Sequence, residues 1–282
     1  GYGNVKEYNK LLLCFLFENG IMNCPVKSIH EHKLEIVQIG KMMYERRFIV
    51  AGDGNISVRL ADDTILATPT ALCKGMLAPD QIVKLDLAGK VLDGEYQPSS
   101  EIKMHLAAYQ TRPDVKAVVH AHPPISTGFA VAGIPLDQLI LAEMVVNFGA
   151  IPLAPYHSPS TKELAESVAE KVRCYDAVLM ANHGVMTIGP DVYTAYHRME
   201  MVEQFAVISL VAHTLGKMNT FSAQQLQDLV GIREKSGIGA QNPYHAQCPL
   251  PGQPECVRLT APGAQNAAPP KPPEIEFLVN TI

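Results

Sequence analysis

The chain of 282 residues has no tryptophan and no surplus of positive charge, with 23 lysines and arginines against 28 aspartates and glutamates. The net charge of −5 argues against a protein that binds nucleic acid or an anionic membrane surface. No run of apolar residues approaches the length of about eighteen that indicates a membrane-spanning helix. The hydrophobic fraction of 47% is instead typical of a globular protein with ample material for a core.

Paired cysteine motifs and nucleotide-binding loops are also missing. The six cysteines form no C-x-x-C pair, and in a chain of this length they indicate neither a disulfide framework nor a zinc ribbon. We therefore expect reduced cysteines and a cytoplasmic location. Neither a Walker loop nor G-x-G-x-x-G occurs, so nothing supports nucleotide hydrolysis or dinucleotide binding. The apolar run 11–17 is followed at once by Glu18, which favours a short helix over a signal peptide.

What is present is an alternation of helical and strand-like periodicity that predicts one α/β domain. Helices are expected over 28–48, 99–112, 125–132, 160–173 and 191–216, and strands over 56–60, 64–69, 82–87, 115–119, 150–156 and within 176–189. Nine of the 21 prolines follow Gly237, which indicates an extended tail. The predicted organisation is an N-terminal extension at 1–27, the α/β domain at 28–220, and a C-terminal segment with a Pro-rich tail at 221–282.

The most informative short stretch is VVHAHPP, in which His120 and His122 end an apolar strand. Alternating residues of a strand point to the same face, so the two imidazoles are expected about 6.5–7 Å apart along the backbone. Two imidazoles on one face can bind a single metal ion. The alternative is a pair of histidines that simply face solvent at a strand end.

Two further residues strengthen the metal hypothesis. His183, in ANHGV, follows another apolar strand at a Gly-containing turn, and Glu101, in PSSE, begins a helix. Three neutral imidazoles can fill three positions of a divalent ion and leave one for substrate, as catalytic zinc requires. Glu101 would be a displaceable ligand or a proton shuttle, or else only a partner of the helix dipole. The other histidines are expected on helix faces, in loops or in the tail: His30, His32, His105, His157, His197, His213 and His245.

Three short polar turns could bind an anion through backbone N–H groups and hydroxyls. They are Gly54–Asn55, Thr68–Thr70 and Ser99–Ser100, and the last opens a helix, where anions are stabilised. Taken alone, each of these turns is explained more simply by ordinary turn chemistry. Lys74 could add positive charge, although a solvated lysine is the simpler interpretation.

The ordered motifs GNIS, TPT, PSSE, HAH, IPLAPY and NHG resemble the class II aldolase/adducin family, especially its L-fuculose-phosphate aldolase branch, over about residues 29–216. The resemblance implies a three-layer α/β/α fold with a mixed, largely antiparallel central sheet, assembled as a homotetramer. It implies Zn²⁺, or Mn²⁺, Co²⁺ or Fe²⁺, on His120, His122, His183 and Glu101, with Glu101 also the catalytic residue. The phosphate of a small-molecule substrate would be held by Gly54, Asn55, Thr70, Ser99 and Ser100.

The activity implied is that of a lyase that cleaves or forms a carbon–carbon bond in a sugar phosphate or hydroxy-keto acid, through an enediolate stabilised by the metal. A metal-dependent decarboxylase of the same family is the alternative. A pentulose-phosphate 4-epimerase is less favoured, since those enzymes resemble this plan but carry aspartate at the position of Glu101. A non-catalytic, adducin-like scaffold is also less favoured, because all three histidines are present.

Two departures from the family pattern concern the substrate. Thr70 is followed by Ala71 where the family usually has glycine, and a Cβ there restricts the backbone. The tyrosine that acts as an acid from a neighbouring subunit should fall near Leu141, where Glu143 is the nearest ionisable residue. We expect the Pro-rich tail to wrap over its own or a neighbouring subunit, where Tyr244 or His245 could replace the missing acid.

Overall fold

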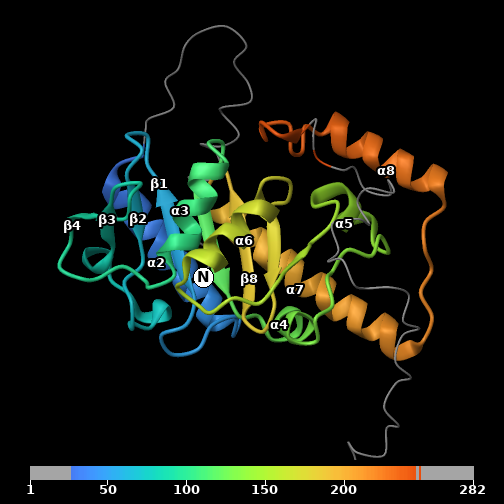
Figure 1. The fold of residues 1–282 in the computed structure, drawn as a ribbon, viewed down its shortest axis with the longest axis horizontal. Coiled ribbons are helices and arrows are strands. Elements are labelled where there is room, and N and C mark those ends of the chain that lie inside the picture. Colours follow the sequence, from blue (N-terminus) through green and yellow to red (C-terminus); the bar gives the residue numbers. More distant parts are fainter. Residues whose placement is uncertain (1–26, 246–247, 249–282) are drawn as a thin grey trace, which may run out of the picture.

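The computed structural model describes residues 27–245 and residue 248 of the chain, and its centre is one eight-stranded sheet (Figure 1). The strands lie in the spatial order β4-β3-β2-β1-β5-β8-β7-β6. Every pair is antiparallel except β6 with β7. The bounds are β1 Asn55–Arg59, β2 Ile65–Ala67, β3 Val83–Leu85, β4 Val91–Asp93, β5 Ala117–Ala121, β6 Leu153–Ala154, β7 Ala177–Met180 and β8 Gly184–Gly189.

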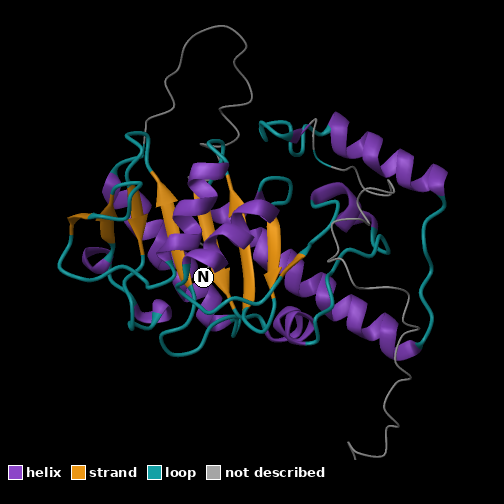
Figure 2. Ribbon diagram, viewed as in Figure 1, coloured by secondary structure: helices purple, strands orange, loops and turns teal. Residues whose placement is uncertain are grey.

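Helices cover both faces of this sheet, as Figure 2 shows. The helices α2, α4 and α7 pack on one face and α3 and α6 on the other. Their bounds are α2 Ile29–Glu45, α3 Ile102–Thr111, α4 Pro124–Val131, α5 Ala142–Asn147, α6 Lys162–Val172, α7 Val192–Leu215 and α8 Ala223–Lys235, with short 3₁₀ turns η1 Lys74–Met76 and η2 Pro79–Gln81. The expected three-layer α/β/α fold with a mixed, largely antiparallel sheet is confirmed.

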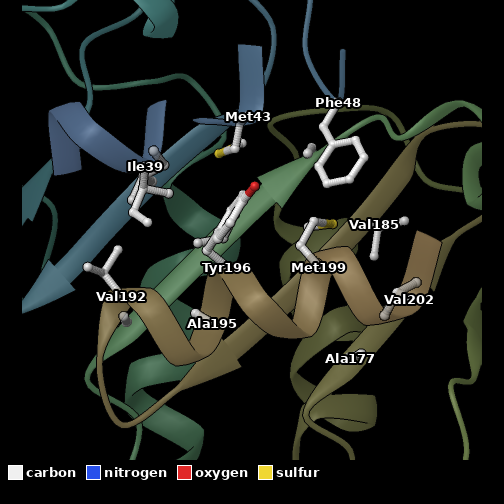
Figure 3. Packing of buried hydrophobic residues seen from close by; sticks show 14 of the residues in the cluster. Ile39, Met43, Phe48, Ala177, Val185, Val192, Ala195, Tyr196, Met199 and Val202 are labelled. Atoms are coloured by element: carbon white, nitrogen blue, oxygen red, sulfur yellow. The ribbon is translucent and has the colours of Figure 1, made fainter. Parts of the chain in front are cut away.

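Two hydrophobic cores, one on each face, fix the orientation of the central strand β5. Ala117, Val119 and Ala121 face the core formed with α2, α4 and α7. Figure 3 shows part of this core, which includes Tyr196 and Met199 of α7. Val118 faces the opposite core beneath α3 and α6. Because side chains alternate along a strand, His120 lies on the face of Val118 and points toward α3.

Local signals in the sequence explain where the main helices begin and end. Ser28 caps α2 in a capping box with Glu31, and the side chain of Asp191 accepts the Thr194 N–H at the start of α7. Gly216 ends α7 in the left-handed conformation, at φ +70°. The 3.6-residue apolar period then decides which helix face is buried.

Several elements differ from the expectation. Strand β5 continues to Ala121 instead of ending at residue 119, so His120 lies inside the strand. Helix α3 begins at Ile102 instead of residue 99, which leaves Ser99–Ser100 in the preceding turn and Glu101 as its N-cap. Strand β6 is only two residues long. The sequence predicted neither α5 nor α8, since both are short or weakly amphipathic and are stabilised by their contact with each other.

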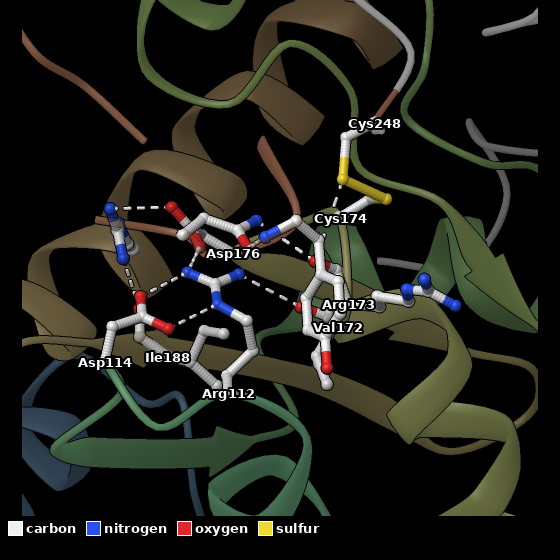
Figure 4. A network of polar contacts seen from close by, with 11 residues as sticks. Arg112, Asp114, Val172, Arg173, Cys174, Asp176, Ile188 and Cys248 are labelled. Atoms are coloured by element: carbon white, nitrogen blue, oxygen red, sulfur yellow. Dashed lines mark hydrogen bonds and ion pairs between the residues drawn. A yellow bond between two sulfur atoms is a disulfide. The ribbon is translucent and has the colours of Figure 1, made fainter. Parts of the chain in front are cut away.

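A polar network lies at the end of the sheet where β7 begins (Figure 4). The Arg112 guanidinium donates to both oxygens of Asp114 and to Asp176, and a fourth bond reaches the carbonyl of Val172. All of the Arg112 partners lie within 3.2 Å. Such a fully paired buried guanidinium fixes the ends of α3 and β7.

One disulfide joins Cys174 to Cys248 beside this network, against the expectation of reduced cysteines (Figure 4). The chain after α8 returns to the start of β7, where the Asn242 side chain donates to the carbonyl of Arg173 at 3.1 Å. The two cysteines are 74 residues apart in sequence, so no spacing pattern indicates the pair. Cys73 is free among the described cysteines. Within the described part of the chain, no helix has the length and apolarity to cross a membrane.

Candidate metal centre

His120 presents its Nε2 atom to a site at the carboxyl end of β5. The side chain is fully buried, and its Nδ1 lies 2.8 Å from the carbonyl oxygen of Val185 in β8. A carbonyl oxygen only accepts, so Nδ1 donates and the neutral ring keeps a lone pair on Nε2. That lone pair points toward the other two histidines.

His122 and His183 complete a group of three imidazoles. The Nε2 atoms of His120 and His122 are 3.2 Å apart, and the potential ligand atoms of all three rings lie within 4.8 Å of one another. His183 enters from the turn between β7 and β8, directly after Asn182 in the left-handed conformation (φ +54°). The three histidines expected to share a metal ion therefore lie together in the structure.

Gly184 is the residue that lets this turn approach β5, a role that the sequence alone does not indicate. A Cβ at Gly184 would lie 2.5 Å from Cδ2 of His122 and 2.6 Å from the carbonyl oxygen of Ala121. Any larger residue would push His122 away from the other two rings. Glycine in the NHG motif therefore has a steric function at the site.

Glu101 faces the three imidazoles from the start of α3. Its Oε1 lies 2.8 Å from Nε2 of His183 and its Oε2 lies 3.4 Å from Nε2 of His120. The side-chain amide of Asn55 donates to Oε2 at 2.8 Å. Burial raises the pKa of Glu101, but His120 and His183 outweigh it through charge and hydrogen bonding and hold the pKa well below its usual range.

The surroundings of His122 disfavour its protonated form. Burial, together with the neighbouring His120 and His183, lowers the pKa of His122 to about 4. A neutral imidazole is the metal-binding form, so this ring is ready to ligate at neutral pH. Three imidazole nitrogens with one adjacent carboxylate match the ligand set of catalytic divalent sites. The residues present thus fit a divalent cation.

A buried polar cluster behind the site attaches α3 to β1. Nδ1 of His105 lies 2.7 Å from the Ser57 hydroxyl, which also lies 2.8 Å from the Tyr109 hydroxyl. Burial and the nearby His120 lower the pKa of His105 to about 3. His105 lies on a helix face, as the sequence predicts, and that face is the buried side of α3. It fixes the helix that carries Glu101 instead of entering the metal site.

The three polar turns also come together next to Glu101. Asn55 Nδ2 donates to the Ser99 hydroxyl at 3.1 Å, and the Ser99 backbone N–H donates to the carbonyl of Thr68. The hydroxyl-bearing residues Thr70 and Ser100 are exposed beside them. Gly54 adopts φ +68°, and a Cβ there would lie 2.9 Å from the carbonyl oxygen of His120. The turns therefore form one polar surface around the carboxylate.

Ala71 adopts the left-handed conformation (φ +61°) that glycine would favour, so the turn keeps its shape despite the Cβ. A non-glycine residue in this region costs roughly 1–2 kcal/mol. Replacing alanine with glycine also lowers the free energy of unfolding by about 0.4–1 kcal/mol, because glycine gives the unfolded chain more conformational entropy. We expect Ala71→Gly to raise the free energy of unfolding by about 0.5–1 kcal/mol, measured by urea denaturation.

Ala61→Gly is the matched control, because Ala61 is an exposed turn residue outside the set with positive φ. It should lower the free energy of unfolding by up to about 1 kcal/mol. Equal destabilisation by both substitutions would contradict the assignment of strain to Ala71.

Lys74 differs from the expectation of a solvated side chain. It is 1% exposed, and its Nζ donates to the carbonyl oxygen of Gly52 at 2.5 Å. Burial lowers the pKa of Lys74, while the carboxylates of Asp53 and Glu101 act in the opposite direction. No pattern in the sequence indicates this burial, which arises because η1 packs against α2.

Glu143 and the candidate substitute acid Tyr244 lie on segments other than those that carry the three histidines and Glu101. Glu143 is in the first turn of α5, and Leu141 is its N-cap. The ring of Tyr244 lies 4.5 Å from the guanidinium of Arg173, just before β7, whereas His183 follows the other end of that strand. Tyr244 therefore does not serve the site of its own chain. The tail after residue 248 lies outside the described residues.

Comparison with known proteins identifies the family. Residues 34–210 match the model of the Class II Aldolase and Adducin N-terminal domain. The chain therefore belongs to the class II aldolase/adducin family.

The relatives most useful for comparison are named after two different activities. The chain is 32% identical over 190 residues to a 3-oxo-tetronate 4-phosphate decarboxylase from Pectobacterium atrosepticum, covering 66% of this chain and 87% of that protein. It is 35% identical over 182 residues to an L-fuculose phosphate aldolase from Methanococcus maripaludis, covering 64% and 97%. Among solved structures, an L-fuculose 1-phosphate aldolase superposes with a TM-score of 0.69 at 30% identity, covering 76% and 99%.

Proposed function

We propose that the protein is a divalent-metal-dependent carbon–carbon lyase of the class II aldolase type, with zinc as the cation and a small sugar phosphate or hydroxy-keto acid as substrate. The observation that carries the proposal is the convergence of three imidazoles from β5 and the β7–β8 turn on one carboxylate. His120, His122 and His183 would hold the cation together with Glu101. The cation supplies Lewis-acid stabilisation of the negative charge that develops on substrate oxygens when the bond breaks.

The chain's own residues would perform the remaining steps. The Glu101 carboxylate lies 2.8 Å from Nε2 of His183 and 3.4 Å from Nε2 of His120, where it would move the proton at the reacting carbon. Asn55 orients that carboxylate through the 2.8 Å bond to Oε2. Thr70, Ser100, the backbone at Gly54 and the start of α3 would hold a phosphate at the remote end of the substrate. Ser99 would support these turns through its bond with Asn55.

A decarboxylase is the second candidate, and a specific observation favours it. In the described part of the chain, Glu143 is the ionisable residue nearest to Leu141, where the resemblance calls for a tyrosine. Loss of CO₂ leaves negative charge on the same oxygens but requires no protonated leaving group from that position. Relatives named 3-oxo-tetronate 4-phosphate decarboxylase are as similar to the chain as those named aldolase.

We also propose a homotetramer in the cytoplasm, with the domain at 28–220 as its catalytic unit. A run of exposed apolar residues on the last turns of α7 supports association: Val207, Leu210, Val211 and Leu215. The composition supports the cytoplasmic assignment, whereas the Cys174–Cys248 disulfide favours a less reducing compartment.

The deciding experiment is elemental analysis of protein purified without a His tag or added metal, followed by assays on two phosphorylated substrates. We expect about one zinc per chain, and activity that a chelator removes and zinc restores. L-fuculose 1-phosphate should yield cleavage fragments if the protein is an aldolase, and 3-oxo-tetronate 4-phosphate should release CO₂ if it is a decarboxylase. A chain that binds no metal even after incubation with zinc would instead be a scaffold with this fold.

A further inference from the structure

The three histidines differ in what their second ring nitrogen meets. Nδ1 of His120 bonds the carbonyl of Val185, while Nδ1 of His183 is buried and has no hydrogen-bond partner among the described residues. Nδ1 of His122 instead faces a carboxylate, with Oδ2 of Asp53 at 3.5 Å. His122 is thus the histidine of the three whose outer nitrogen faces an ionised group.

The loop that carries Asp53 is constrained on both sides. Ala51 and Gly54 adopt left-handed conformations at φ +47° and +68°, and the Asp53 backbone N–H donates to the carbonyl of Val50 at 2.9 Å. The buried Nζ of Lys74 bonds the carbonyl of Gly52. A buried ammonium group is costly unless it has compensating partners, and Asp53 is the carboxylate that offsets its burial most. Lys74 therefore connects the loop to η1.

A carboxylate opposite Nδ1 has a defined effect on a metal-binding imidazole. It holds the proton on Nδ1, leaves the lone pair on Nε2 and makes that nitrogen more basic. In this chain Nε2 of His122 is the atom that faces His120. The partner of the His120 ring is thus a backbone carbonyl, whereas that of the His122 ring is the Asp53 side chain.

We propose that Asp53, supported by Lys74, is the positioning residue that orients His122 and sets its tautomer for metal binding. This inference rests on the proposed metal site. It adds to that site a residue outside the GNIS motif and a loop whose conformation controls metal affinity.

Zinc affinity is the first test, measured by competition with a chromophoric chelator on the full chain. Asp53→Asn keeps the shape but removes the charge, and we expect zinc to bind about 10-fold to 100-fold more weakly than to the wild type. Asp63→Asn is the matched control, because Asp63 is also an exposed carboxylate, lies at the other end of β1 and pairs with Arg59. The zinc affinity of the Asp63→Asn protein should stay within twofold of that of the wild type.

A second measurement separates orientation of the ring from support of the backbone. In metal-free protein with ¹⁵N-labelled histidine, the Nδ1-protonated tautomer of His122 should predominate and should give way to a tautomer mixture in Asp53→Asn. Lys74→Met should weaken zinc binding as well, and the double variant should bind no more weakly than Asp53→Asn alone, since both act through one loop. Additive losses would show two independent effects and overturn the proposed link.

The outcomes distinguish this inference from the proposed function. If the wild type binds no zinc, the proposed function fails and the inference fails with it. If the wild type binds zinc and Asp53→Asn binds it equally, with an unchanged His122 tautomer, only the role of Asp53 is overturned.

Discussion

Replacing Glu101 with glutamine is expected to lower kcat by about 10²–10⁴-fold while one divalent ion per chain remains bound. Glutamine fills the same space between His120 and His183 and can still accept from the Asn55 amide, so the three imidazoles should keep their positions. What it cannot do is take up or deliver a proton. Steady-state kinetics and elemental analysis on the same sample measure both effects.

Glu95→Gln is the control for this substitution. Glu95 is an exposed glutamate in the segment that leads to Ser99, and the same change of charge there should leave kcat and metal content unchanged. Glu101→Gln protein that lost its metal but retained turnover would refute the role assigned to the carboxylate. Loss of both would make Glu101 a ligand required for metal retention.

The second large effect is expected for His183→Ala, which removes one of the three proposed nitrogen ligands. Two imidazoles and one displaceable carboxylate remain, so zinc affinity should fall by more than the roughly 10–100-fold typical of an outer-shell residue. Turnover should fall in parallel. Isothermal titration with zinc and the activity of the same protein measure the two losses.

His157→Ala is the matched control, since His157 lies in the loop after β6, outside the group of three, and is likewise partly buried. Its zinc affinity should equal that of the wild type. The His183→Ala protein should remain folded, because His183 lies in a turn and belongs to neither core. Zinc bound with wild-type affinity by His183→Ala would disprove the three-histidine site.

Much of the fold was predictable because its signals are local. The apolar period of residues 29–45, with Ser28 as cap, predicts α2, and the alternation in VVHAH predicts a strand with both histidines on one face. Helices α5 and α8 were missed, since each is stabilised by packing on the other, and such packing leaves little periodicity in sequence. The Cys174–Cys248 pair was also missed, because it forms only where the chain after α8 returns to the start of β7.

For the candidate site, the sequence by itself determined which residue types stand at strand ends and helix starts: His120, His122, His183 and Glu101. Only the tertiary structure decided that they meet, because the antiparallel pairing of β5 with β8 sets His120 opposite Met186, close to the turn that carries His183, and the packing of α3 adds Glu101. It also decided the roles of Gly184, Lys74 and Asp53. Their importance comes from distance and burial, which depend on contacts between segments far apart in the chain and leave no spacing pattern in the sequence.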